Sequence, residues 1–198
     1  MSPPDSTKFK FEDAAVLLAM NGDAELDILS RILLGFRIRS PKRCATGAEA
    51  QEALAAEPYD LVISDMTLPD MSGPELVRWL RCSELEPNRF VATLIVSGHA
   101  REKIVFQARD SGTNFILTKP ITPRVLFDRI IWVAKETRAF VETEAYVGPD
   151  RRFQNFGPPP GVAGRRRGDL SANVGLATEP NLSQAANDAL LIPVKRAG

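Results

Sequence analysis

Three polar residues in this sequence each come directly after a short, mostly apolar run: Asp65, Ser97 and Lys119. A carboxylate can attack a phosphoryl group as a nucleophile, and a hydroxyl and an ammonium can hold the oxygens of that group during transfer. Lys119 would add a charge-assisted hydrogen bond. If the three side chains meet in the fold, the sequence predicts covalent acceptance of a phosphoryl group on Asp65.

The runs before these residues are part of a regular alternation of strand-like and helix-like segments. From residue 14 to about residue 135, short β-branched or aliphatic runs alternate with longer stretches whose apolar residues recur at helical spacing. Such alternation is typical of strand–helix–strand units around a parallel sheet. We expect strands at residues 15–19, 42–45, 60–64, 92–96 and 114–118.

Two of the expected helices begin with recognisable signals. Asp23 and Ser72 are suitable N-terminal caps, and Pro74 suits a first helical turn because the N–H that it lacks would be unpaired there. In an open parallel sheet, ligand-binding groups gather at the carboxyl ends of the strands, where the strand order reverses. We therefore expect a doubly wound α/β fold with five parallel strands and with the three polar residues at one edge of the sheet.

Three segments resemble the motifs of one known family, the receiver domains of bacterial two-component response regulators. Residues 60–73 (DLVISDMTLPDMSG) are similar to the phosphoacceptor strand and loop of that family, and residues 96–99 (VSGH) to its hydroxyl-bearing strand end. Residues 118–120 (TKP) resemble its Lys–Pro motif. The resemblance covers about residues 14–135 and implies the flavodoxin-like, CheY-like fold.

The resemblance also implies roles for individual residues and partners for the chain. Asp65 would be the phosphoacceptor, and Ser97, Lys119 and Thr67 would bind the phosphoryl group. The Lys119–Pro120 peptide bond would be cis, an isomer accessible essentially only before proline. The implied partners are a histidine kinase or phosphotransfer protein and a downstream protein target. No enzymatic activity is expected beyond phosphoryl acceptance and autodephosphorylation.

The sequence departs from the receiver pattern after the first expected strand. Most receivers carry two adjacent acids there, which bind Mg²⁺ together with the acceptor, but Met20 and Asn21 occupy these positions here. Mg²⁺ keeps several waters and needs one or two protein carboxylates, so Asp65, Asn21 and Asp23 are the candidate ligands. Asp23 has the alternative role of a helix cap. We expect Mg²⁺ binding to be weakened.

A second departure lies three residues before Lys119. The family usually has Tyr or Phe at this switch position, and this chain has Ile116. Phe115 cannot simply substitute for it, because successive residues of a strand point to opposite faces. Without an aromatic rotamer switch, a signal would have to pass through Ser97 and residues 98–101 into the following helix.

The composition is that of a globular chain without a membrane span. The sequence is 44% hydrophobic and 25% charged, and its apolar runs are shorter than the ~20 residues that cross a bilayer. No secretory signal is recognisable, so we expect a cytoplasmic protein. Cys44, Cys82 and the single His99 lie too far apart in the sequence to suggest a disulfide framework or a zinc site.

The composition changes after the expected receiver segment. We divide the chain into an N-terminal extension (1–13), a receiver domain (14–136), a linker rich in Pro, Gly and Arg that is mostly disordered (137–180), and a possible short helix (181–192). The chain has no net charge, but residues 148–198 carry seven basic and four acidic side chains, a net +3. The preceding residues are therefore acidic overall.

Arginines in the tail allow two interpretations. They could be solvated, or they could bind an anion or nucleotide, because a planar guanidinium holds phosphate bidentately and stacks on bases. Residues 146–152 resemble weakly the arginine-rich extensions with which some CheY-like proteins bind cyclic di-GMP. Specific DNA binding is not expected, because no recognition helix is evident. The candidate residues in the tail are Asp150, Arg151, Arg152, Arg165, Arg166 and Arg167.

Two classes of function remain open from the sequence. The first is a phosphorylation-operated switch that signals through protein contacts without a DNA-binding output domain, favoured by Asp65, Ser97 and Lys119. The second is an adaptor, or a cyclic di-GMP-binding module, built on a partly degenerate receiver. The second class is favoured by Met20, Asn21 and Ile116.

Overall fold

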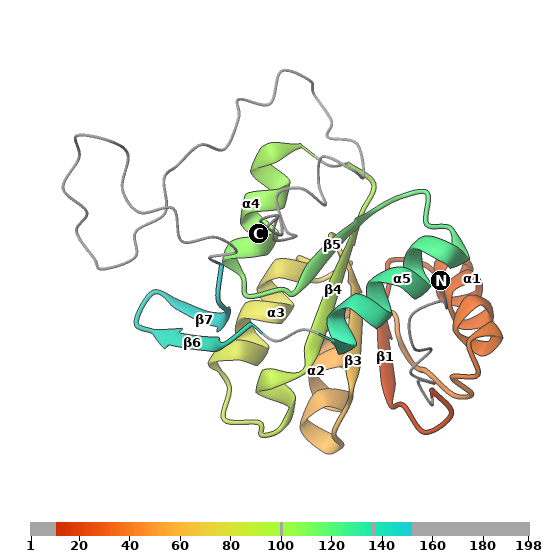
Figure 1. The fold of residues 1–198 in the computed structure, drawn as a ribbon, viewed down its shortest axis with the longest axis horizontal. Coiled ribbons are helices and arrows are strands. Elements are labelled where there is room, and N and C mark those ends of the chain that lie inside the picture. The colour runs from red at the N-terminus through yellow and green to blue at the C-terminus, as the bar shows by residue number, and fades with distance from the viewer. Residues whose placement is uncertain (1–10, 100, 136–137, 152–198) are drawn as a thin grey trace, which may run out of the picture.

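A computed structural model describes residues 11–99, 101–135 and 138–151 of the chain. Strands and helices alternate through most of this part (Figure 1). In chain order they are β1 (Val16–Ala19), α1 (Asp23–Gly35), β2 (Lys42–Cys44), α2 (Gly47–Ala56), β3 (Leu61–Asp65), α3 (Gly73–Cys82), the 3-10 turn η1 (Asn88–Phe90), β4 (Ala92–Ser97), α4 (Glu102–Asp110), β5 (Phe115–Thr118), α5 (Pro123–Ala134), β6 (Phe140–Thr143) and β7 (Tyr146–Pro149).

The first five strands form one parallel sheet in the order β2-β1-β3-β4-β5. The strand order reverses beside β1, since β2 lies on one side of it and β3 on the other. The doubly wound sheet expected from the sequence is confirmed. The register pairs Asp65 with Val96 and Ser97 with Thr118, so β3, β4 and β5 end at the same edge. This shared edge is what brings residues distant in the sequence to one site.

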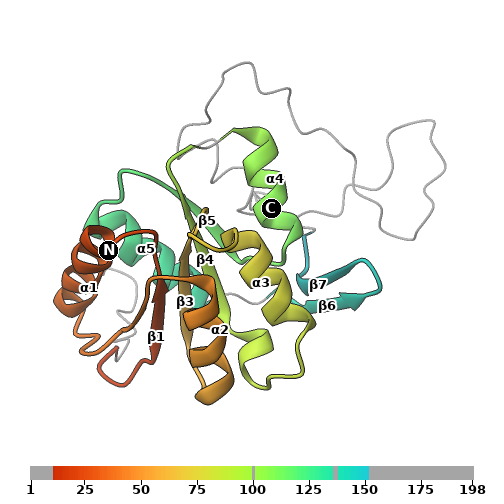
Figure 2. The ribbon, with the colours of Figure 1, turned by 180° about the vertical axis from the view of Figure 1, so that it is seen from behind.

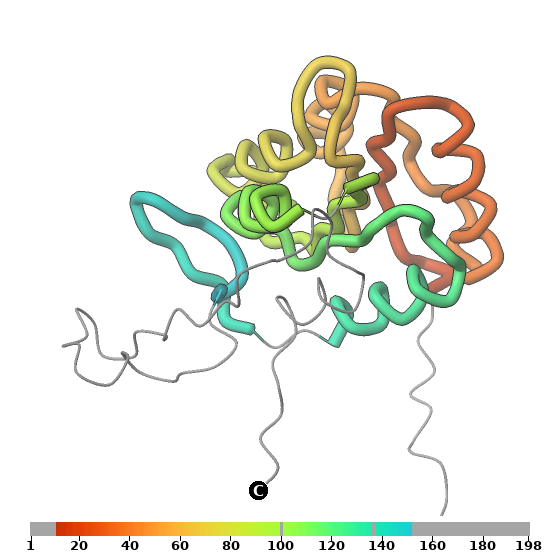
Figure 3. Tube along the Cα trace, turned by 90° about the horizontal axis from the view of Figure 1, so that it is seen from above, coloured from red at the N-terminus to blue at the C-terminus, as the bar shows by residue number. Residues whose placement is uncertain are grey.

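Helices cover both faces of the sheet. Figures 1 and 3 show α1 and α5 on one face, and the view from behind in Figure 2 shows α2, α3 and α4 on the other. Leu29 of α1 and Leu126 of α5 are buried in the larger apolar cluster, and Leu54 of α2 and Leu80 of α3 in a second cluster. Full burial of one such side chain contributes about 1.5–3 kcal/mol. These two cores hold the strand ends in fixed positions.

The start of α3 follows the sequence prediction. Ser72 is the N-cap, its hydroxyl accepts a hydrogen bond from the Glu75 N–H, and the Glu75 carboxylate accepts one from the Ser72 N–H. Pro74 lies in the first turn. Gly73 is required by a close approach, because a Cβ there would lie 2.2 Å from the carbonyl oxygen of Asp65. The helix therefore packs directly against the strand end that carries Asp65.

The prediction that Asp23 caps α1 is wrong. The N-cap is Gly22, with φ 128°, and Asp23 is the first residue of the helix. Glycine adopts this backbone conformation without the steric cost of a Cβ. Asp23 and Glu25 are instead acids of the first turn, where negative charge interacts favourably with the helix dipole.

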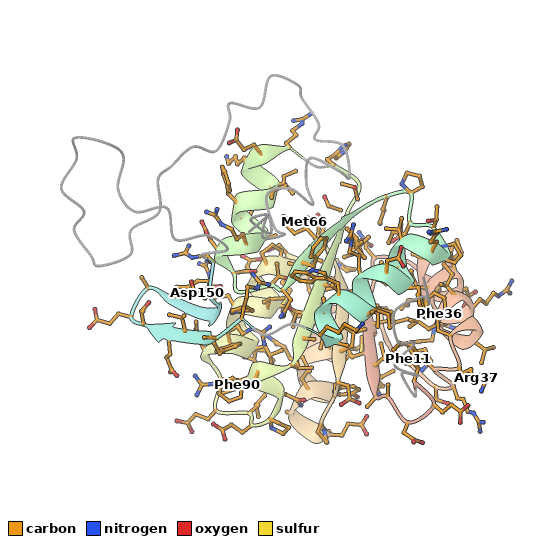
Figure 4. All side chains as sticks on the ribbon, viewed as in Figure 1. Phe11, Phe36, Arg37, Met66, Phe90 and Asp150 are labelled. Atoms are coloured by element: carbon orange, nitrogen blue, oxygen red, sulfur yellow. The ribbon has the colours of Figure 1, made fainter. Side chains whose placement is uncertain are left out.

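Residues 11–13 of the expected N-terminal extension pack on the domain. Phe11 and Phe36 both make edge contacts with Phe127 of α5, with ring centroids 5.9 and 5.2 Å apart. Figure 4 shows Phe11 and Phe36 together on this side of the molecule. The ordered unit thus includes residues before position 14. In the described part of the chain, no helix is long and apolar enough to cross a membrane.

Residues 138–151 do not form the expected disordered linker. They contain an antiparallel hairpin of β6 and β7, with Phe140 opposite Pro149. The hairpin lies beside α3 and α4 (Figures 1 and 3). Sequence reasoning missed it because Gly148 and Pro149 indicated a linker, whereas both are buried against the domain. The rest of the linker and the possible helix at 181–192 lie outside the described residues.

Candidate functional site

Asp65 is the last residue of β3, and its side chain is almost enclosed, with the residue 7% exposed. The Met66 N–H donates to Oδ1 at 2.8 Å, and the Lys119 ammonium donates to Oδ2 at 2.9 Å. Met66 lies at the carboxyl edge of the sheet in Figure 4. Both oxygens of the candidate nucleophile are therefore held in defined directions, one by the backbone and one by a cation.

Lys119 follows the end of β5, and its backbone N–H donates to the Ser97 carbonyl at 2.8 Å. The Lys119–Pro120 peptide bond is cis, as the sequence motif implied. Burial lowers the pKa of the Lys119 ammonium, but hydrogen bonds and charge attraction from Glu25 and Asp65 outweigh burial and raise the pKa above its ordinary value. Lys119 is therefore a fixed cation beside the Asp65 carboxylate.

Glu25 is a member of this cluster that sequence reasoning missed. Both of its carboxylate oxygens lie 2.7 Å from the Lys119 Nζ. The sequence prediction examined the positions directly after β1, whereas Glu25 lies in the first turn of α1. The sequence feature that could have identified Glu25 is an acidic residue in the first helical turn after the first strand. Such a residue can reach the carboxyl edge of the sheet.

Ser97 and Thr67 are at this edge but make other contacts. The Ser97 hydroxyl donates to the His99 carbonyl at 2.6 Å and accepts from the His99 N–H at 3.2 Å, which closes the turn after β4. Thr67 is exposed in the loop after β3 and forms an isolated bridge with Ser72. The structure thus joins Asp65 directly to Lys119 and leaves the two hydroxyls nearby.

The candidate metal ligands do not fit a Mg²⁺ site of the expected kind. Met20 is 1% exposed and is packed in the core, so its thioether occupies the place of an acid. Asn21 and Asp23 are both exposed. Among the residues that the structure describes, no cluster of three His, Cys, Asp or Glu side chains could hold a metal ion. Mg²⁺ prefers oxygen ligands, and of the three candidates only Asp65 is enclosed, with one of its oxygens bound to the Lys119 ammonium.

The switch position is filled by a fully buried aliphatic residue. Ile116 is 0% exposed and pairs with Ile95 of β4. Phe115 contacts Trp132 of α5, with ring centroids 5.1 Å apart, so it points to the α5 face of β5. Because adjacent strand residues point to opposite faces, Phe115 does not occupy the switch position.

In the tail, only Asp150 and Arg151 of the candidate anion-binding residues are described. The Arg151 guanidinium lies 2.6 Å from Asp110 and over the ring of Tyr146, 4.2 Å from its centroid. Asp150 donates its backbone N–H to the Ala139 carbonyl at 2.8 Å. Both are therefore attached to the hairpin and α4. The other four candidates, Arg152, Arg165, Arg166 and Arg167, lie outside the described residues.

The arrangement of the strand ends matches a known family. Residues 16–131 match the family model described as the response regulator receiver domain. The chain belongs to the response regulator receiver family. It is therefore a receiver of two-component signalling, in which receivers interact with histidine kinases or phosphotransfer proteins.

A curated protein is similar to part of the chain, and a solved receiver domain has the same fold. The chain is 28% identical over 126 residues to the sensory/regulatory protein RpfC of Xanthomonas campestris pv. campestris, a match that covers 62% of this receiver and 17% of RpfC. It resembles the solved receiver domain of a signal transduction histidine kinase from Syntrophus aciditrophicus at 23% identity and a TM-score of 0.56, covering 67% of this chain and 99% of that one. The receiver thus corresponds to a small part of RpfC.

A second solved receiver domain is described with a bound metal. It is the receiver domain of a sensor histidine kinase from Pseudomonas aeruginosa PAO1, solved with a magnesium ion coordinated in the active site cleft. The likeness has 22% identity and a TM-score of 0.55, and covers 62% of this chain and 98% of that one. It supports the same fold.

Proposed function

We propose that this receiver accepts a phosphoryl group on Asp65 and signals through contacts with a downstream protein. One observation carries the proposal: the Lys119 ammonium lies 2.9 Å from the Asp65 carboxylate at the carboxyl edge of the sheet. A nucleophile and a cation placed together in this way suit phosphoryl transfer, which depends mainly on positioning and on charge stabilisation.

The reaction follows from the groups at hand. An Asp65 oxygen attacks phosphorus, the bond from phosphorus to the donor breaks, and the donor leaves with the bonding electron pair. With a phosphohistidine donor, the imidazole nitrogen is released and an acyl phosphate forms on Asp65. Lys119 stabilises the negative charge on the transferred oxygens through its ammonium. Ser97 can turn its hydroxyl toward the same oxygens once the contact with His99 opens.

The output begins with the charge that phosphorylation adds. A phosphoryl group brings further negative charge and several acceptor oxygens to a site bordered by the turn that Ser97 closes with His99. A rearrangement of Ser97 would displace the turn after β4. This displacement would in turn shift the start of α4 at Glu102. Because Ile116 is aliphatic and buried, the signal passes through this turn and α4 without an aromatic switch.

A degenerate receiver that acts as an adaptor is the second candidate. The buried Met20 at an expected metal-ligand position favours it, because the site then gains little from Mg²⁺. In that case the fold would present its surface to a partner irrespective of phosphorylation. A nucleotide-binding role for Arg151 gains no support, because its guanidinium is bound to Asp110 and lies over Tyr146.

Direct phosphorylation separates the two candidates. The full chain is incubated with acetyl phosphate, with and without Mg²⁺, and intact mass is measured before and after hydroxylamine, which cleaves acyl phosphates. We expect one phosphoryl group on the wild type and none on Asp65→Asn. Asp128→Asn, an exposed aspartate variant on α5, is the matched control and should behave as wild type. An unmodified wild type under all conditions would favour the adaptor.

A further inference from the structure

The ammonium of Lys119 is bound to two carboxylates in this structure, and a phosphoryl oxygen would have to compete with them. A lysine ammonium carries three N–H donors. Three carboxylate oxygens surround it: both oxygens of Glu25 at 2.7 Å and Oδ2 of Asp65 at 2.9 Å. A phosphoryl group on Asp65 therefore competes with Glu25 for the charge and the hydrogen bonds of Lys119.

The contact that can break without moving the acceptor is the one to Glu25. Asp65 is at the end of a central strand and also accepts a hydrogen bond from the Met66 N–H. Glu25 reaches Lys119 from the first turn of α1, and its side chain is 38% exposed. Glu25 can therefore rotate toward solvent, and this rotation costs less free energy than a movement of Asp65 would.

Apolar neighbours strengthen the ion pair between Glu25 and Lys119. The two residues line a cavity of about 230 Å³ with apolar neighbours, among them Met20, Leu29 and Ile121. Charges beside apolar groups interact more strongly than charges in bulk water. The buried Met20, which lines the same cavity, brings no charge to it.

The charges of the cluster oppose loading. Asp65 and Glu25 each carry −1 and Lys119 carries +1, so the three groups sum to −1 before a phosphoryl group arrives. Each anion added next to them is repelled by Glu25. Loading must overcome this repulsion and compete with Glu25 for the Lys119 ammonium.

We propose that Glu25 is a positioning residue that holds Lys119 in the resting site and restrains phosphoryl loading of Asp65. This inference rests on the proposed phosphoacceptor function. On loading, Lys119 exchanges the Glu25 oxygens for oxygens of the phosphoryl group, and Glu25 turns outward. Glu25 thus sets how readily the receiver leaves its resting state.

The competing explanation is purely structural: an acid in the first turn stabilises the start of α1 through the helix dipole. Asp27 provides the matched comparison, because it is on the same helix and forms an ion pair of its own, 2.7 Å from Arg43. Glu25→Gln and Asp27→Asn each remove one negative charge and keep the side-chain size. Only Glu25→Gln removes the charge that holds Lys119.

The experiment measures the dissociation constant of beryllofluoride, an analogue of the phosphoryl group, by NMR on the full chain, and the rate of modification by acetyl phosphate. Both are measured with and without Mg²⁺. We expect Glu25→Gln to bind beryllofluoride about tenfold more tightly and to react faster by a similar factor, since a unit charge a few ångströms away is removed. Asp27→Asn should stay within about twofold of wild type, because its charge pairs elsewhere and is screened.

A second measurement follows the lysine itself. The NMR signal of the Lys119 ε-methylene, assigned by its loss in Lys119→Arg, should sharpen in Glu25→Gln because the side chain is less constrained and reorients faster. A role confined to helix stability would leave this signal unchanged. Thermal unfolding of Glu25→Gln checks that the variant is folded.

The outcomes distinguish this inference from the proposed function. If wild type loads and Glu25→Gln loads equally or less well, Glu25 does not restrain the site and the inference is wrong. A loss of loading in Glu25→Gln that occurs only with Mg²⁺ would make Glu25 a metal ligand and would also overturn it. If neither protein takes up phosphate or beryllofluoride, the phosphoacceptor function fails and the inference fails with it.

Discussion

Gly148 of β7 lies against Gly112, in the turn between α4 and β5, so closely that a Cβ on Gly148 would lie 2.6 Å from the Gly112 Cα. The fit is reciprocal, since a Cβ on Gly112 would lie 2.3 Å from the Val147 carbonyl oxygen. The hairpin therefore packs backbone to backbone on the amino edge of the sheet, opposite the acceptor site. It is an integral part of this receiver although the family match ends at residue 131.

We predict that Gly112→Ala destabilises the domain by about 2 kcal/mol, because the new methyl group would push the hairpin away and because Gly112 has φ +90°, which strains other residues. Urea denaturation of the full chain measures the change. Gly35→Ala is the control, since a Cβ there meets nothing within 4 Å. Equal midpoints for the two variants would show that the hairpin does not depend on this contact.

The side chain of Arg81 contacts the hairpin and three other parts of the domain. It is 0% exposed and donates to the Gly112 carbonyl at 3.1 Å, the Arg89 carbonyl at 2.7 Å and Oγ1 of Thr93 at 3.1 Å. Its guanidinium also lies over the ring of Phe140 of β6, 5.2 Å from the centroid. Burial lowers the pKa of Arg81 to about 10, which leaves it charged at neutral pH.

We predict that Arg81→Ala destabilises the domain by about 3 kcal/mol, because it leaves buried carbonyl and hydroxyl groups without their donor and opens a cavity. Arg81→Lys should be intermediate, since an ammonium cannot reproduce the planar fork. Arg78, exposed on the same helix, supplies the control, and its alanine variant should stay within about 0.5 kcal/mol of wild type. If Arg81→Ala lost as little stability as Arg78→Ala, Arg81 would have no role in holding the hairpin on the domain.

The sequence predicted the part of the site that strand ends determine. Asp65 and Lys119 follow apolar strands, and parallel strands bring their carboxyl ends together, so their meeting could be expected. Glu25 could not be found in this way, because its partner is 94 residues away and the contact depends on how α1 is rotated on the sheet. Ser97 was placed at the correct edge, but its hydrogen bond to His99 depends on a turn geometry that the residue types do not specify.

The hairpin escaped prediction for a related physical reason. Gly148 and Pro149 are typical of linkers, and only contact with Gly112 and with other distant residues stabilises a strand there. Tertiary packing of this kind overrides local propensity. The surface on which the hairpin packs depends on Arg81. Its burial without a carboxylate partner among the described residues is unusual for a charged side chain.

A pH prediction concerns Asp70, in the loop that follows Asp65 and β3. Its carboxylate accepts hydrogen bonds from the N–H groups of Gly47 and Ala48, at 2.7 and 2.8 Å, and so caps the start of α2. These bonds favour the charged form and lower the pKa of Asp70. A lowered folded-state pKa gives stability that is present above the ordinary pKa of about 4 and is lost as pH falls through the folded value.

We therefore expect the melting temperature to fall as pH drops below about 4, and to fall less steeply in Asp70→Asn than in wild type. The comparison is made by calorimetry between pH 7 and pH 2.5 at constant ionic strength. At pH 7 the variant should already melt at a lower temperature, because an amide caps the helix less well than a carboxylate. Parallel curves for the two proteins would show that the Asp70 cap does not contribute to acid unfolding.

The last prediction concerns Lys119, the cation on which the phosphoacceptor proposal depends. Lys119→Met should reduce the rate of modification by acetyl phosphate at least about a hundredfold, the usual effect of removing one electrostatic stabiliser of a transition state. The same change removes the only described cation bound to Asp65 Oδ2, so the approach of an anion becomes less favourable. Lys103→Met, an exposed lysine variant on α4, is the control and should react as wild type does.

The raised pKa of Lys119 adds a test of stability. The ion pairs of Lys119 stabilise the fold below the ordinary lysine pKa and are lost as pH rises through the folded value. Wild type should therefore lose stability above about pH 10.4, and Lys119→Met should lose less over the same range. If acetyl phosphate modified Lys119→Met at a rate within a few fold of wild type, another group would stabilise the phosphoryl oxygens. The contact between Asp65 and Lys119 would then be structural only.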